Sequence, residues 1–547
     1  MAEAGVGSGL TRRRFLRAVG RTSGAGAMLA AMGALDLAVS SDTPWPPFRQ
    51  LSYADFRLSG RSAAKVVIVG GGVAGLACAY ELGKAGYDCT VLEANHWAGG
   101  RNLTVRNGFE LTELGGVKQR VGFTEGQYMN TGPGRIAQWM VTMDYCRELN
   151  IPLEVFSDVN HDAYVFNEKD GMQPGHPLRR RAVVADAYGY LSELLAKATD
   201  QGALDKRLTP EDREKLIEFL RQFGNIGRKR PGDPERSFVY DGGSARGYSR
   251  WPGATGDPGV RTEPKVAPLS QIITKEVGDI FEFVMDYKHA TVMMQPIGGM
   301  DAIPRALAKA IGAQKIKLNS PVTGITDGPD RVSVRYRDNG GPERQIDADY
   351  CILTGSPQLL ARLPHNLGPD VQKALNTYQM NEAGKIGLEY RRRWWEIEDR
   401  IYGGVTETDM DIRRIWYPST GYHSERGILV GYYNTGDNAV TYGAMNHAAR
   451  EARALAQGVK IHGPKYRTEL ARSFSIAWHR VPYLENGWQN IPDGPDAPVY
   501  APLSRPSGSG RTYFAGDWLS HTVSWQHGAF LSARKTVTAI HQRSLAH

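Results

Sequence analysis

The sequence predicts an α/β protein that combines a Rossmann-type nucleotide-binding domain, a mixed-sheet domain and a helical insertion. Three observations predict this organisation. A strand–glycine loop–helix–strand unit begins near Lys65, apolar residues at helical spacing fill much of 139–290, and strand-like runs alternate with helices afterwards. A chain of 547 residues has room for two or three domains or one large composite. Its 41% hydrophobic and 23% charged residues are ordinary for a globular protein.

The first residues have the composition of an export signal. The stretch "TRRRFLRAVG", from Thr11 to Gly20, is followed by an Ala/Gly-rich stretch from Ala25 to Val39, as in a bacterial twin-arginine signal. We expect 1–40 to be this signal, with cleavage after Ser40, and the mature protein to be periplasmic or secreted; an amphipathic or disordered basic tail is the alternative. No later stretch approaches about 18 apolar residues, so no stable membrane insertion is expected after the signal is removed.

The net charge and the cysteine pattern argue against two other classes, nucleic-acid-binding proteins and metal-binding proteins. The formal charge is +8, of which five arginines and two acids in 1–40 contribute +3. The remaining +5 is modest for this length and does not favour a nucleic-acid partner. Four cysteines occur, without CxxC spacing or histidines at ligand spacing, so no metal site is expected. They are Cys78, Cys89, Cys146 and Cys351.

The strongest motif is a glycine-rich loop between a strand and a helix. A β-branched run, Val66–Val69, leads into GxGxxG, and a helical pattern follows over about 73–84. Gly70 permits a tight turn, Gly72 lets the backbone approach a pyrophosphate, and Gly75 lets the helix pack on the strand. The helix N-terminus then offers free N–H groups to phosphates. The unit therefore predicts a dinucleotide site.

A second strand and an acid complete the unit. The strand-like run 89–92 ends at Glu93, 18 residues after Gly75, where a carboxylate can accept hydrogen bonds from ribose hydroxyls. "AGGRNLT" follows, with Gly100 and Arg101 in a second glycine–arginine stretch. This stretch resembles the flavin amine oxidase family, in which it supports the pyrophosphate of FAD. The resemblance therefore favours FAD over NAD.

The resemblance continues to the C-terminus. "QPIGGMDAIPRALAKAI" resembles the family's central segment, and "RTYFAGDWLSHTVSWQHGAFLSARKTV" its closing flavin motif. It implies that the backbone of Val322 pairs with adenine, that Asp517 binds the ribityl chain and that Trp478 contacts the flavin. Gly134 and Gln526 complete the expected cofactor contacts. Relatives with covalent flavin use a cysteine in the closing segment; the last cysteine here is Cys351, so we expect non-covalent FAD.

The resemblance also divides the chain into discontinuous domains. The expected boundaries are 1–40 for the signal, 41–64 for a linker, 65–138, 291–357 and 501–547 for the FAD-binding domain, 139–290 for the mainly helical insertion over the substrate funnel, and 358–500 for the substrate-binding domain. Within the insertion, 241–259 is too rich in glycine and proline for regular structure and is interpreted as a possible lid or a plain surface connection.

Candidate substrate anchors follow from the same resemblance. "NTGPGRI" resembles the segment in L-amino acid oxidases and in the aromatic amino acid oxidase/monooxygenase group whose arginine binds the substrate α-carboxylate, here Arg135. A guanidinium fork matches a carboxylate bidentately, which a lysine cannot do. The alternative is that Arg135 caps a helix or pairs with a protein carboxylate. Tyr417, in "RRIWYPS", is the expected second anchor, and Trp416 is expected on the other face of the strand. The alternative is that Tyr417 is an ordinary core residue.

Two further residues are expected at the reacting centre. Lys385, in the strand-like "AGKIGLEY", matches the family lysine that holds a water near flavin N5 and assists the reaction with oxygen; a snorkelling lysine is the alternative. Trp525 matches an aromatic wall beside the flavin, or is ordinary core. No histidine is assigned a catalytic role.

These observations predict an FAD-dependent L-amino acid oxidase that gives a 2-oxo acid, ammonia and hydrogen peroxide. The tryptophans of the closing motifs favour an aromatic or large apolar side chain. The alternatives are an L-amino acid 2-monooxygenase giving amide, CO2 and water, an amine oxidase for substrates without carboxylate, and, least favoured, a non-enzymatic flavin-binding secreted protein. A homodimer is possible by analogy with relatives.

Overall fold

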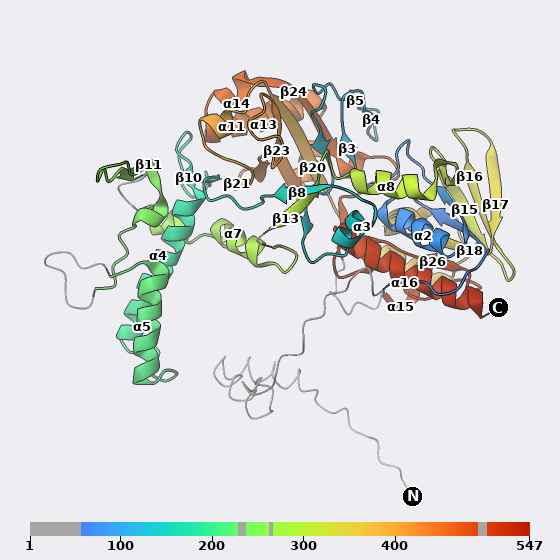
Figure 1. The fold of residues 1–547 in the computed structure, drawn as a ribbon, viewed down its shortest axis with the longest axis horizontal. Coiled ribbons are helices and arrows are strands. Elements are labelled where there is room, and N and C mark those ends of the chain that lie inside the picture. Colours follow the sequence, from blue (N-terminus) through green and yellow to red (C-terminus); the bar gives the residue numbers. More distant parts are fainter. Residues whose placement is uncertain (1–55, 228–236, 262–265, 291, 491–499, 547) are drawn as a thin grey trace, which may run out of the picture. The chain divides into compact units, whose positions relative to one another are not determined.

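The computed structural model describes residues 56–227, 237–261, 266–290, 292–490 and 500–546 (Figure 1). The expected export signal, its cleavage site and most of the expected linker lie outside these residues. Within the described part of the chain, no helix is both long and apolar enough to cross a membrane.

A five-stranded parallel sheet forms the nucleotide-binding layer (Figure 1). Its strands come from three distant parts of the chain and pair in parallel, as in a Rossmann-type sheet. In sheet order they are β14 (Ile316–Lys317), β2 (Asp88–Leu92), β1 (Lys65–Val69), β18 (Tyr350–Leu353) and β26 (Thr512–Phe514). The central strands are almost wholly apolar because both faces of the sheet are covered.

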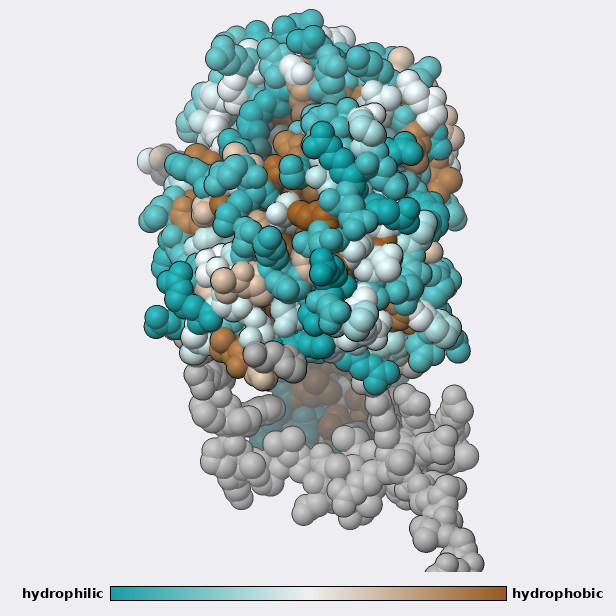
Figure 2. Space-filling view, turned by 90° about the vertical axis from the view of Figure 1, so that its right-hand side faces the viewer, coloured by the Kyte–Doolittle hydropathy of each residue, from teal (hydrophilic) through white to brown (hydrophobic). Residues whose placement is uncertain are grey.

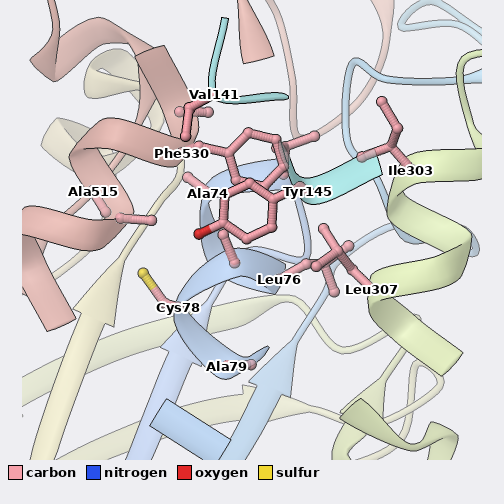
Figure 3. Packing of buried hydrophobic residues seen from close by; sticks show 14 of the residues in the cluster. Ala74, Leu76, Cys78, Ala79, Val141, Tyr145, Ile303, Leu307, Ala515 and Phe530 are labelled. Carbon is pink, nitrogen blue, oxygen red and sulfur yellow. The ribbon is translucent and has the colours of Figure 1, made fainter. Parts of the chain in front are cut away.

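Helices α2 (Val73–Lys84), α8 (Ala302–Ile311) and α16 (Gln526–Leu545) pack together against this sheet. Figure 3 shows part of their core, in which Leu76 of α2 lies beside Leu307 of α8. The ring of Tyr145, from α3 (Thr142–Glu148), stacks on Phe530 of α16 with centroids 3.9 Å apart. Segments far apart in sequence therefore share one core.

A seven-stranded mixed sheet forms the second layer, as the sequence predicts. In sheet order its strands are β10 (Leu178–Arg179), β9 (Tyr164–Phe166), β21 (Val405–Thr408), β22 (Arg414–Trp416), β23 (Gly427–Thr435), β20 (Ala383–Tyr390) and β24 (Leu470–Ala477). Only the β9–β21 pairing is parallel. Because β9 and β10 belong to this sheet, part of 139–290 is built into the substrate-binding domain and is not a separate helical insertion.

The helices of 139–290 are α3, described above, and α4 (Arg180–Asp200), α5 (Pro210–Gly224), α6 (Leu269–Ile272) and α7 (Lys275–Met285). Sequence signals set the helix ends. The Thr209 side chain accepts a hydrogen bond from the N–H of Asp212 at the start of α5, and Asn225 ends that helix with φ of 52°. The Thr274 side chain caps α7 in the same way.

The glycine-rich stretch 241–259 is more regular than its composition predicts. It contains a 3₁₀ turn (Ser244–Arg246) and the strand β11 (Tyr248–Arg250), which pairs with β12 (Val260–Arg261). Arg246 binds Asp186 of α4 at 2.7 Å, with both side chains buried. None of residues 241–259 lines the large cavity described below. The structure therefore places this stretch against α4, and the interpretation as a lid has no support in it.

The remaining elements are shorter or peripheral. The strands are β3 (Thr104–Val105), β4 (Glu110–Thr112), β5 (Lys118–Arg120), β6 (Met129–Asn130), β7 (Ile136–Ala137), β8 (Leu153–Phe156), β13 (Met293–Pro296), β15 (Val322–Asp327), β16 (Val332–Arg337), β17 (Glu343–Ala348), β19 (Gln379–Asn381) and β25 (Trp488–Asn490). The helices are α9 (Pro357–Arg362), α10 (Pro369–Thr377), α11 (Trp394–Ile397), α12 (Gly436–Gly443), α13 (His447–His462), α14 (Lys465–Thr468) and α15 (Tyr500–Leu503).

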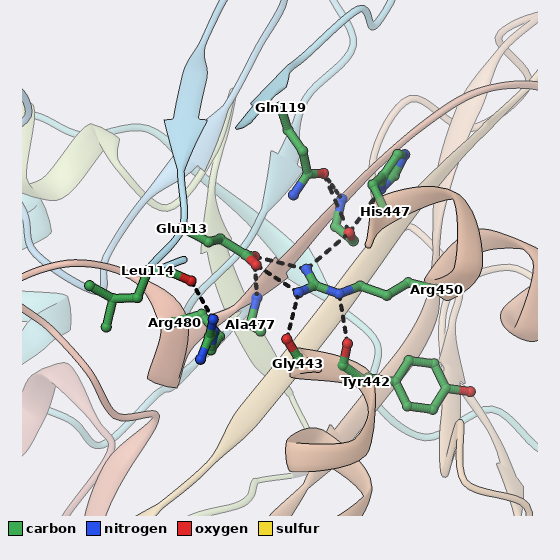
Figure 4. A network of polar contacts seen from close by, with 10 residues as sticks. Glu113, Leu114, Gln119, Tyr442, Gly443, His447, Arg450, Ala477 and Arg480 are labelled. Atoms are coloured by element: carbon green, nitrogen blue, oxygen red, sulfur yellow. Dashed lines mark hydrogen bonds and ion pairs between the residues drawn. The ribbon is translucent and has the colours of Figure 1, made fainter. Parts of the chain in front are cut away.

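A buried ion pair joins α13 to the end of β4 (Figure 4). Arg450 of α13 binds Glu113, which follows β4, with Nη2–Oε2 and Nη1–Oε1 distances of 2.6 and 2.8 Å. Its Nε donates to the carbonyl of Tyr442, and Glu113 Oε1 also accepts from the N–H of Ala477. The pair is almost completely enclosed, and these additional bonds satisfy its charged groups.

The face of the molecule in Figure 2 is mainly hydrophilic, and its hydrophobic residues occur as separate small spots. Scattered apolar residues of this kind are usual on protein surfaces. This face therefore gives no indication of a partner.

Candidate active site

A cavity of about 930 Å³ connects the two layers. One end lies at the carboxyl ends of β1 and β2 and at the N-terminus of α2. The other end lies against β20, β22 and β23 of the mixed sheet. Ligands of open α/β sheets bind outside the carboxyl ends of the strands. The first end is therefore placed to bind a nucleotide, and the second end is placed to bind a substrate.

The glycine loop at the nucleotide end has little room for side chains. Gly70 has φ of +105°, which only glycine adopts readily, and a Cβ on Gly75 would lie 2.0 Å from the Gly70 carbonyl oxygen. A Cβ on Gly72 would meet no atom within 4 Å, and Gly72 lines the cavity. The side of Gly72 is therefore open for a close approach by phosphate, beside the free N–H groups of the first turn of α2.

Glu93 lies at the end of β2 beside this loop. Its Oε2 accepts from the N–H of Gly71 and its Oε1 from the N–H of Asn95, both at 2.7 Å. Burial raises the pKa of the Glu93 carboxyl, and the two backbone N–H groups oppose that shift. Each oxygen still has a lone pair for a ribose hydroxyl.

The second glycine stretch meets the closing segment. Gly100 has φ of +57° and lies beside Gly72. Arg101 Nη2 binds Asp517 Oδ1 at 2.5 Å, while Asp517 Oδ2 accepts from the N–H of Ser524 at 2.9 Å. The two predicted cofactor residues Arg101 and Asp517, which are 416 positions apart, therefore form one unit at the cavity wall.

Four further predicted cofactor residues line the same cavity: Val322, Gly134, Trp478 and Gln526. Trp478 is fixed by a 3.0 Å hydrogen bond from Nε1 to the carbonyl of Thr131. Gln526 begins α16, and its buried Nε2 has no hydrogen-bond partner among the described residues. A buried amide donor without a partner is costly, so it fits an acceptor supplied by a bound group. The open side of Gly72 and this orphaned donor, which line the same cavity, both fit a bound FAD.

Lys385 lines the cavity from the buried strand β20. Its Nζ donates to the carbonyl of Gly132 and lies 4.7 Å from the ring centroid of Tyr433. Burial, together with the charge of Arg135, lowers the pKa of Lys385 to about 7. Because desolvation disfavours the ammonium form, this lysine can exchange a proton near neutral pH.

Arg135 lies at the substrate end, surrounded by aromatic rings. Its Cζ is 5.4, 4.9 and 5.3 Å from the ring centroids of Phe283, Trp416 and Trp525. Its Nε binds Asp158 Oδ2 at 3.1 Å. The Nε atom of Arg135 is therefore paired with a protein carboxylate, as the alternative interpretation expected. Burial lowers the pKa of Arg135, and Asp158 opposes the shift.

A histidine closes a three-residue ring with this pair. His289 Nδ1 lies 3.0 Å from Asp158 Oδ2, and His289 Nε2 lies 3.4 Å from Arg135 Nη2. A neutral imidazole that donates from Nδ1 to the carboxylate leaves Nε2 as an acceptor for the guanidinium. Nη1 of Arg135 makes no hydrogen bond with any described residue, and Arg135 lines the cavity.

Tyr417, the expected second substrate anchor, is among the residues that line the cavity, but its hydroxyl is bonded elsewhere. The Tyr417 hydroxyl lies 2.8 Å from both Thr406 Oγ1 and His462 Nε2, on the far side of the sheet. Trp416 faces Arg135 instead, because neighbouring side chains of a strand point to opposite faces.

The structure adds site residues that carried no sequence motif. These are Asp158, His289, Phe283, Arg414 and Tyr433. Residues 414 and 416 lie on the same face of a strand, so the face that carries Trp416 also carries Arg414. This alternation is the one sequence signal that could have identified any of the five residues.

Comparison with known proteins now decides the family. A model for "Flavin containing amine oxidoreductase" matches residues 73–541. The chain belongs to this family. It is therefore a flavin-dependent oxidoreductase, and FAD is the cofactor that the cavity accommodates.

Members of the family with assigned activities resemble the chain over most of its length. An L-amino-acid oxidase from Bothrops pauloensis is 28% identical over 508 residues, covering 87% of this chain and 90% of that protein. An L-amino-acid oxidase from Protobothrops flavoviridis is 26% identical over 508 residues, with the same coverage. Among solved structures, cyclohexylamine oxidase from Brevibacterium oxydans has a TM-score of 0.57 at 18% identity, covering 89% of this chain and all of that one. The structural likeness supports the fold.

Proposed function

We propose that this protein is an L-amino acid oxidase that uses FAD. One observation carries the proposal: a buried arginine, Arg135, presents donors to the substrate end of a flavin cavity, beside Lys385. An amine without a carboxylate has no use for such a group. The similarity to proteins named L-amino-acid oxidases supports the same choice of substrate. The twin-arginine pattern of 1–40 supports export as a further part of the proposal.

The residues of the site have separate tasks in this reaction. The Nη edge of Arg135 binds the α-carboxylate, and burial strengthens that charge-assisted bond. The rings of Trp416 and Trp525 exclude water, which favours the neutral amine that the oxidation requires. FAD, when bound, supplies the chemistry of hydride acceptance and of electron transfer to oxygen. The orientation of the substrate and the exclusion of water come from the protein.

Peroxide release tests the proposal. The purified holoenzyme is incubated with L-amino acids and, separately, with putrescine and cyclohexylamine. We expect peroxide with one or more L-amino acids and little with the amines. Turnover of amines alone would refute the proposal. Product analysis for 2-oxo acid against amide then separates an oxidase from a monooxygenase.

Asp158→Asn tests whether the partner of Arg135 positions the anchor. An amide keeps the size of Asp158 but removes its charge, so the Nε bond and the His289 contact both weaken. We expect kcat/KM for the preferred L-amino acid to fall roughly 10- to 100-fold, mostly through KM, at unchanged flavin content. An unchanged kcat/KM would show that Arg135 needs no partner to hold its position.

Lys385→Met tests the oxygen reaction separately. Methionine fills a similar volume without an ionisable group, so reduction by substrate should change little. We expect the rate constant with oxygen to fall about 100-fold, in the range of general acid–base effects. In the wild type this rate constant should decline as pH rises through about 7, because Lys385 loses its proton there. Stopped-flow reoxidation measures both, and an identical pH profile in the variant would contradict the assignment.

A further inference from the structure

Arg414 is a second guanidinium in the substrate end of the cavity. It shares a strand face with Trp416, which contacts Arg135. Its Nε binds Glu407 Oε2 at 2.8 Å, and the two residues are direct cross-strand partners on β22 and β21. Nη1 and Nη2 make no hydrogen bond with the described residues, and the side chain keeps 26% of its surface accessible. Arg414 therefore has a fixed stem and an unused donor edge.

The two guanidinium groups both lie close to the ring of Phe283. The Cζ of Arg414 is 4.6 Å from the centroid of Phe283, and the Cζ of Arg135 is 5.4 Å from the same centroid. Their separation is therefore about 10 Å at most, and both line the cavity. An extended diacid with carboxyl carbons about 5 Å apart could reach both with hydrogen bonds of about 2.8 Å.

The charged side chains around the substrate end of the cavity favour an anionic group on the substrate. Arg135 and Arg414 each have one carboxylate on Nε, and the buried Arg180 has only a backbone carbonyl as its hydrogen-bond acceptor among the described residues. Its guanidinium interacts electrostatically with the same two carboxylates. Three guanidinium groups therefore interact with only two carboxylates, those of Asp158 and Glu407, which leaves an excess of positive charge. Asp279 adds a weaker, more distant contribution at Arg414, and at the cavity edge Lys288 and Asp286 pair with each other.

We propose that the preferred substrate is an L-amino acid with a carboxylate in its side chain, recognised by the Nη edge of Arg414. The proposal rests on the proposed function, with Arg135 binding the α-carboxylate. An aromatic side chain would leave the Arg414 donors desolvated without an acceptor, which is unfavourable. A basic side chain would face the unpaired guanidinium edge. This inference replaces the aromatic preference expected from the tryptophans.

Substrate competition on the holoenzyme tests the preference. Wild-type protein is assayed for peroxide with L-glutamate, L-aspartate, L-glutamine, L-phenylalanine and L-lysine. We expect the highest kcat/KM with a dicarboxylate, and a fall of roughly 10- to 100-fold for the matching amide. A preference for phenylalanine or lysine would overturn the Arg414 proposal alone. Turnover of amines without any amino acid would instead overturn the proposed function and this inference with it.

Variants of Arg414 then assign the preference to this residue. Arg414→Gln should lower kcat/KM for the dicarboxylate roughly 10- to 100-fold and that for phenylalanine less than about threefold. Glu407→Gln/Arg414→Gln leaves no unpaired carboxylate and should give the same selectivity change if the single variant folds poorly. Arg472→Gln, outside the cavity, is the matched control and should behave as wild type. Equal losses for both substrates would overturn the assignment.

Discussion

Arg135→Lys is expected to lower kcat/KM for the preferred L-amino acid by about 100- to 1,000-fold while the protein keeps its yellow cofactor. Lysine retains the positive charge but has no planar fork. It cannot bind Asp158 and a substrate carboxylate at the same time in the geometry that Nε and Nη provide. Losing two charge-assisted hydrogen bonds of about 1.5–3 kcal/mol each accounts for a loss of this size.

Steady-state kinetics with flavin absorbance separates this effect from unfolding or cofactor loss. Arg135→Ala should be at least as defective as Arg135→Lys. Any slow oxidation of an amine without carboxylate should be unchanged in both variants, since the anchor has nothing to bind there. A proportional loss with amino acid and amine would assign Arg135 to the stability of the cavity wall, and unchanged amino acid kinetics would remove it from the site.

The nucleotide end of the site could be predicted because its signals are local. The strand, loop, helix and acid follow one another within residues 65–93. The glycines are required where a side chain would not fit; a Cβ on Gly75, for example, would lie 2.0 Å from the Gly70 carbonyl oxygen. The family resemblance then connected Asp517 to the same site. In the structure Arg101 and Asp517 are in direct contact.

The substrate end could be predicted only in part because its contacts are distant in sequence. Asp158, which follows β8, and His289, which follows α7, are separated by 131 positions and meet only in the folded chain. The face of β22 depends on its pairing with β21 and β23, and a three-residue strand has too little alternation to reveal it. For this reason Arg414 was overlooked.

Breaking the buried pair of Arg450 and Glu113 is expected to cause the largest loss of stability of any single substitution considered (Figure 4). Arg450→Met should reduce the free energy of unfolding by about 3–5 kcal/mol, because it leaves the Glu113 carboxylate buried without its charged partner. The Tyr442 and Gly443 carbonyls also lose a donor. Urea unfolding followed by tryptophan fluorescence would show this as a lower midpoint.

Two variants distinguish the cost of an unpaired charge from the net value of the ion pair. Glu113→Gln/Arg450→Met should recover much of the loss, because neither buried charge remains. Arg453→Met is the control on the same helix: its pair with Asp411 is at the surface, with 43% of the arginine side chain exposed, and should cost less than about 1 kcal/mol. If the double variant were as unstable as Arg450→Met, the stability would come from the hydrogen bonds to the carbonyls and to Ala477, and not from the avoidance of an isolated charge.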